Sequence, residues 1–238
     1  MKGSIRVGML ALAISASISS ATVFTVTNTN DSGAGSLRQA ILNANANAGA
    51  DTITFNIPGP GVQTIAPLTA LPEITGAVAI NGYSQPGSST NSNAFGAMNA
   101  VILVRLDGHQ LTNDQSTALR FNAVNGGSVG GWVIVRFDVG IDIYNSSGVV
   151  IAGNSIGLDV DGIARGMTFQ GVYISCPVFG QATNNRIGST SPADRNVISG
   201  NGDGVFLFNN GREQFRARQL ISTDATGHCR AAICSPES

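Results

Sequence analysis

The chain has 238 residues, of which 13 are basic and 14 acidic, and its formal net charge is −1. Such a balance creates no field that would attract a nucleic acid or an anionic membrane, so we expect neither as a partner. Only 6% of the residues are aromatic whereas 42% are hydrophobic, so the core must consist of aliphatic side chains, as in regular β layers. The length is consistent with one domain.

The N-terminus has the pattern of a secretory signal peptide. Lys2 and Arg6 precede an apolar run, residues 7–18, and small residues follow as far as Ala21. The run is shorter than the roughly 20 residues that a helix needs to cross a bilayer. A retained anchor or a buried helix is the alternative. We therefore expect residues 1–21 to be cleaved, the mature chain to lack a transmembrane segment, and the protein to be secreted or held at the cell surface.

A short amphipathic helix is expected over about residues 36–47. Ser36 and Gln39 have the spacing of a capping box. The apolar residues of this segment recur at helical spacing: Leu37, Ala40, Ile41 and Ala44. Arg38 is expected to fix the helix to the rest of the chain, with ligand binding as the alternative. Strands should follow from residue 51, and the polar stretch 84–99 should form a projecting loop.

Short strand-like segments repeat along the chain. Gly140-Ile-Asp-Ile143, Gly171-Val-Tyr-Ile174 and Gly204-Val-Phe-Leu207 start 31 and 33 residues apart. Strands related by one repeat would stack in parallel about 4.8 Å apart, which predicts a parallel β-helix. The expected helix at 36–47 would then cover one end of the solenoid. An antiparallel sandwich is the alternative, but it would require hairpin turns that the repeats do not provide.

Four segments carry a resemblance to a known family. They are residues 24–41, which include Ser36-Leu-Arg-Gln-Ala40, and residues 50–55, 80–87 and 195–201. The chain resembles bacterial secreted proteins in which a Ser-Leu-Arg-Glu/Gln-Ala motif precedes right-handed, pectin-lyase-like parallel β-helix repeats. The resemblance covers about residues 22–227, with Gly35 where the family often has Cys. It implies an all-β, right-handed solenoid over residues 22–211 and no particular chemistry, since most members have no assigned activity.

One outer face of the predicted solenoid has a row of polar and aromatic residues. Alternation within the repeated strands places Asp142, Tyr173 and Phe206 outside, and Arg120 falls in the preceding coil. Aromatic faces beside a charged pair form a candidate carbohydrate groove. The alternative interpretation is an ion pair and an aromatic stack that stabilise neighbouring strands.

Other candidate residues have mostly structural interpretations. Asp159 and Asp161 could chelate calcium, but the matching repeat copy keeps only the first carboxylate, as Asp224, which favours a turn; we expect no cofactor. Asn154 and Asn185, 31 residues apart, are expected to stack as an asparagine ladder. His109, in a turn, is an isolated catalytic candidate.

These patterns favour a non-catalytic extracellular β-helix protein that binds polysaccharide or a partner along its outer face. The alternative is a polysaccharide lyase or hydrolase. Enzymes of pectin-lyase-like fold use clustered carboxylates on this face, and here only Asp138 with Asp142 and Asp159 with Asp161 are close in sequence.

The repeat pattern degrades after residue 211. Residues 212–238 are expected to form an incomplete last coil or a tail, so a truncated fragment without independent function, with end-to-end self-association, is a further alternative. Cys229 and Cys234 could form a disulfide, and Cys176 is expected to be a buried small hydrophobe.

Overall fold

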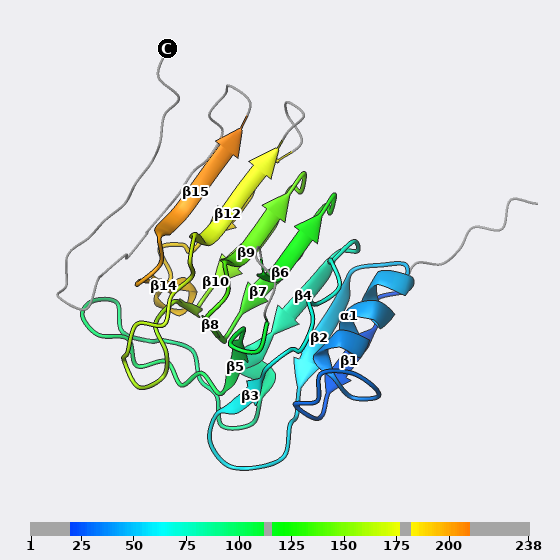
Figure 1. Cartoon of the computed structure of the whole chain (residues 1–238), viewed down its shortest axis with the longest axis horizontal. Helices are drawn as coiled ribbons and strands as arrows, with labels where there is room; N and C mark the ends of the chain where they lie inside the picture. The colour runs from blue at the N-terminus through cyan, green and yellow to red at the C-terminus, as the bar shows by residue number, and fades with distance from the viewer. Residues whose placement is uncertain (1–19, 112–115, 177–181, 210–238) are drawn as a thin grey trace, which may run out of the picture.

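The computed structural model describes residues 20–111, 116–176 and 182–209 (Figure 1). The expected tail at 212–238, with Cys229 and Cys234, and all but the last two residues of the expected signal segment lie outside these ranges. Within them, no helix has the length and apolarity needed to cross a bilayer.

The described strands form three parallel sheets. The first contains, in spatial order, β1 (Val23–Val26), β2 (Asp51–Phe55), β4 (Val78–Asn81), β7 (Ser128–Gly130), β10 (Val150–Ala152) and β13 (Arg186–Ile187). The second contains β14 (Val197–Ile198), β11 (Ser155–Ile156), β8 (Trp132–Val135), β5 (Val104–Asp107) and β3 (Gln63–Ile65). The third contains β15 (Asp203–Asn209), β12 (Gln170–Cys176), β9 (Val139–Tyr144) and β6 (Thr117–Asn122). From β7 onward the chain enters the three sheets in turn, three times over. The expected all-β class with parallel strands is thus confirmed.

The repeated glycine segments occupy equivalent places in the third sheet. Val172 of β12 is paired with Ile141 of β9 and with Val205 of β15. A Cβ atom at Gly140 would overlap the carbonyl oxygen of Gly171, so the missing side chain lets the two backbones approach. A slip of one residue would place Ile141 and Val172 on opposite faces of the sheet. Their direct pairing confirms the predicted register.

The core between the sheets is aliphatic, as the composition predicts. Its fully buried residues are mainly Ile, Val and Leu from all three sheets. Four aromatic residues join them: Phe55, Phe121, Trp132 and Phe137. The rings of Phe55 and Trp132 meet edge to face with centroids 5.0 Å apart. Cys176 is buried at the end of β12, as expected.

The expected helix is present as α1 (Leu37–Ala46), which lies against β1 and β2 (Figure 1). The Ser36 side chain accepts a hydrogen bond from the Gln39 backbone N–H at 3.2 Å. The reciprocal half of the capping box is absent in this structure because the Gln39 side chain donates to Asn43 instead. Arg38 pairs with Asp31 and donates to backbone oxygens of residues 69 and 70, so it fixes the helix as predicted.

The polar stretch 84–99 follows the 3-10 helix η1 (Gly82–Ser84) and does not project freely, which corrects the prediction. Arg195 donates to the carbonyl oxygens of Asn93 and Gly96, at 3.0 and 2.9 Å. Asn91 donates to the Pro192 carbonyl of the 3-10 helix η2 (Pro192–Asp194) at 2.8 Å. The loop is therefore held against the connection between β13 and β14, which a polar composition alone does not predict.

The asparagine ladder exists, but its expected partner is wrong. Asn154 stacks on Asn196, whose side-chain oxygen accepts from the Asn154 backbone N–H at 3.0 Å and from its Nδ2 at 3.1 Å. Asn185 instead precedes β13 in the first sheet, where it bonds the backbone of Val149 and Ser146. The same Asn-x-Ile pattern opens strands in two different sheets, so sequence spacing alone pairs the wrong copies.

Candidate functional site

The predicted row runs straight across the third sheet. Arg120 on β6 is paired with Asp142 on β9, Asp142 with Tyr173 on β12, and Tyr173 with Phe206 on β15. The Tyr173 and Phe206 rings are tilted by 39° with their centroids 5.7 Å apart, and both residues are partly exposed. We call these four residues the sheet row.

Asp142 differs from the expectation because it is buried rather than exposed, with 5% of its surface accessible. Its Oδ2 lies 3.4 Å from Arg120 Nε, while its Oδ1 is buried and accepts no hydrogen bond from any described residue. Burial raises the pKa of this carboxyl to about 6; the Arg120 charge opposes the rise and the Glu73 charge adds to it. Asp142 is therefore a carboxyl that can hold a proton near neutral pH.

Glu73 joins this site although the sequence pattern did not identify it. Its Oε1 lies 3.4 Å from the same Arg120 Nε, and its Oε2 accepts from Asn122 at 2.7 Å. The neighbouring Ile74 forms a parallel bridge with Phe121, which brings Glu73 beside β6. Arg120 also lies 4.7 Å from the centre of the Tyr144 ring. Two carboxyls thus flank one guanidinium at the end of the sheet row.

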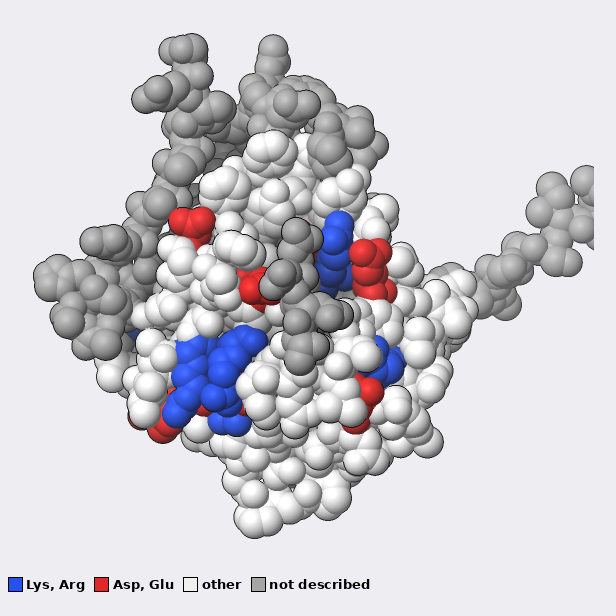
Figure 2. All heavy atoms as spheres, in the orientation of Figure 1, with Lys and Arg blue, Asp and Glu red and all other residues white. Residues whose placement is uncertain are grey.

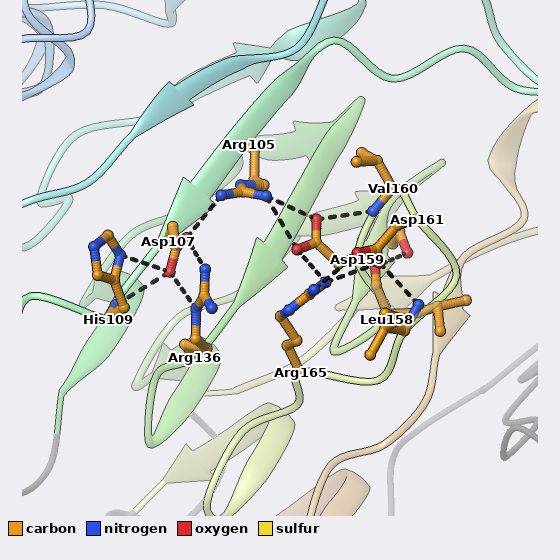
Figure 3. Close-up of polar contacts among 11 residues, drawn as sticks. Arg105, Asp107, His109, Arg136, Leu158, Asp159, Val160, Asp161 and Arg165 are labelled. Carbon is orange, nitrogen blue, oxygen red and sulfur yellow. Dashed lines mark hydrogen bonds and ion pairs between the residues drawn. The ribbon is translucent and has the colours of Figure 1, made fainter.

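A second charged cluster lies where β5, β8 and β11 of the second sheet end (Figure 3). We call it the arginine corner: Arg105, Asp107, His109, Arg136, Asp159, Asp161 and Arg165. Asp107 is at its centre, fully buried, and accepts from Arg105, Arg136 and the His109 backbone N–H. Burial alone would raise the pKa of Asp107, but the Arg136 and His109 hydrogen bonds lower it to about 2.

The candidate calcium residues belong to this corner. Asp159 Oδ2 lies 2.7 Å from Arg165 and 3.0 Å from Arg105, and Asp161 pairs with Arg165 at 2.8 Å. Arg165 hydrogen bonds lower the pKa of Asp161 to about 2. Asp159 also accepts from the Val160 backbone N–H at 2.8 Å, as the turn interpretation predicts. Arginines thus occupy the oxygens that a cation would need, and the described ranges contain no group of three metal-ligating side chains.

His109 is part of the corner rather than isolated. Its Nδ1 lies 3.2 Å from Asp107 Oδ1, and its imidazole is partly exposed. Only one signal in the sequence points to the corner: alternation places Arg105 and Asp107 on the same side of β5. Arg136, which follows β8, and Arg165, in the turn after β11, are distant from β5 in sequence, and no periodic pattern marks either of them.

Comparison of the sequence with models of known protein families and with curated proteins gives no match. The resemblance to secreted β-helix proteins therefore stays a prediction.

Proposed function

We propose that the described chain is a right-handed parallel β-helix of the secreted, pectin-lyase-like kind, with α1 as its N-terminal cap. The passage of the chain through three parallel sheets in turn supports this fold. In such a solenoid the third sheet is one long side, and the sheet row crosses its successive coils.

We further propose that the protein is a non-catalytic extracellular binder of polysaccharide along the sheet row. The observation that carries this proposal is the alignment of Tyr173 with Phe206 on adjacent strands, both partly exposed and in the same row as Arg120, from which the buried Asp142 separates them. Two aromatic rings on adjacent strands, with centroids 5.7 Å apart, can each contact one of two successive sugar rings, and Arg120 can donate to sugar hydroxyls.

Alanine substitution of the aromatic pair tests this function. Y173A and F206A should each weaken binding to a glycan identified on a polysaccharide panel, and the double variant should abolish it, because stacking supplies most of the contact. F95A is the matched control, since Phe95 is an exposed aromatic residue on the 84–99 loop. Unchanged binding in a folded double variant would overturn the proposal and leave the aromatic pair as a lateral stabilising stack.

A glycosidase or lyase is the second candidate, and the pair of Asp142 and Glu73 favours it. A buried carboxyl with a raised pKa and a half-exposed carboxyl beside one arginine provide a proton donor and a base. Release of reducing or unsaturated ends from a polysaccharide, lost in D142N, would establish this activity. If the glycan bound through the aromatic pair is not cleaved under any condition, the non-catalytic function stands.

A further inference from the structure

The arginine corner holds its positive charges outside and most of its negative charges inside. The side chains of Arg105, Arg136 and Arg165 are 21%, 37% and 26% exposed, whereas those of Asp107 and Asp159 are 0% and 1% exposed. Lys2 is the only lysine, so every blue atom in Figure 2 belongs to an arginine. The largest blue group there lies over the region of β5 and β8, with red atoms mainly at its margin. The surface at this corner is therefore cationic although the cluster as a whole is nearly balanced.

Hydrogen-bond donors remain after the internal pairs are made. Arg136 uses Nε and Nη2 on Asp107, and its Nη1 makes no hydrogen bond within the described part of the chain. Arg165 uses both Nη atoms on Asp159 and Asp161, and its Nε makes no hydrogen bond with any described residue. The exposed Asp161 carboxylate thus competes for Arg165, and Arg136 is the main group with donors to spare.

The free donors are held in place by the buried carboxylates. Asp107 binds Arg136 through two atoms of its guanidinium, and the Arg136 backbone N–H donates to the Arg165 carbonyl at 3.0 Å. Arg136 also has a φ of 62°, in the left-handed region that a side chain of this size rarely adopts. Such strain is stored where the surrounding structure enforces it, often at binding sites.

We infer that the arginine corner is a binding site for an oxyanion, with Arg136 Nη1 as its principal donor and His109 and Arg165 at its rim. A fixed, planar guanidinium with free N–H groups matches carboxylate, sulfate and phosphate oxygens, and it loses little conformational entropy on binding. This site is separate from the sheet row and does not depend on the proposed polysaccharide function. Because the site is partly exposed, a free anion should bind with a dissociation constant on the order of 1 mM.

Titration of the protein with inorganic sulfate, inorganic phosphate and acetate, each at constant ionic strength against chloride, tests the inference. We expect saturable binding of at least one anion, followed by the NMR signals of the arginine Nε–H groups. R136K keeps the positive charge but loses the planar guanidinium and its several N–H donors, so it should weaken binding about tenfold. R186K is the matched control, because Arg186 is 41% exposed and paired with the single carboxylate Asp194; it should bind as the unsubstituted protein does.

The unsubstituted protein also gives a readout that does not depend on any variant folding. Saturating shifts at Arg136 and Arg165, but not at Arg38 or Arg195, support the site. A linear response to every anion, or equal weakening by R136K and R186K in folded protein, would overturn it. Titrations with oligogalacturonate and with sulfated dextran oligosaccharides then distinguish a polymer-borne group, which should bind more tightly than the free ion, from the free ion itself.

Discussion

Asp107 and Asp142 are both buried next to arginines, yet the two sites have opposite electrostatics. Their exposed fractions are 0% and 5%, but the pKa of Asp107 is lowered to about 2 while that of Asp142 is raised to about 6. Asp107 receives hydrogen bonds from three residues, whereas the nearest donor to Asp142 among the described residues is the Arg120 Nε at 3.4 Å. Burial by itself therefore does not set the charge state of a carboxyl. The number of hydrogen-bond donors that lie next to it does.

The largest expected effect is the loss of the Asp107 carboxylate. D107N should lower the free energy of unfolding by about 3–5 kcal/mol, because it replaces one oxygen of the buried carboxylate with an amide N–H group that faces the N–H groups of Arg105 and Arg136. Urea denaturation measures this. D161N is the control: Asp161 is exposed and also pairs with an arginine, so its loss should change stability little. Equal effects of the two substitutions would show that Asp107 is not the centre of the corner.

The raised pKa of Asp142 predicts an unusual pH dependence. The folded state binds this proton more tightly than the unfolded chain, whose carboxyl has the ordinary pKa of 3.8. The stabilisation is therefore complete below about pH 4 and is lost as the pH rises to about 6, by about 3 kcal/mol in total. The difference in unfolding free energy between the unsubstituted protein and D142N, measured across this range, should show the fall. A flat difference would mean that Asp142 is solvated.

The smallest expected effect tests the corrected ladder. In a double-mutant cycle, N154A and N196A should be coupled by about 1 kcal/mol, because Asn154 Nδ2 donates a hydrogen bond to Asn196 Oδ1. N154A and N185A should be additive, since the two side chains share no hydrogen-bond partner among the described residues. Coupling in the second cycle and none in the first would restore the pairing expected from sequence spacing.

Much of this fold was predictable because its strands recur as repeats in the sequence. The interval between Gly140 and Gly171 predicted the register of the third sheet, and with it the sheet row. Local signals predicted α1 almost to the residue. These features depend on neighbours in sequence or on exact repeats, which a single sequence contains.

Three features were not predictable, each for a physical reason. Alternation places Asp142 on the outer side of β9 but does not reveal what buries it there. Arg105 and Asp159 meet across 54 residues, and no periodic pattern links them. Asn185 and Asn196 precede strands of similar sequence in different sheets, and only the lengths of the intervening turns decide which one lies on Asn154.

The most direct test is an NMR titration that follows the side-chain carboxyl carbons of Asp107 and Asp142 in the same sample. The account predicts midpoints near pH 2 for Asp107 and near pH 6 for Asp142, with the protein folded throughout the Asp142 transition. Midpoints that coincide near the ordinary value of 3.8, or that are reversed, would contradict the claim that hydrogen-bond donors rather than burial decide the charge of these two sites.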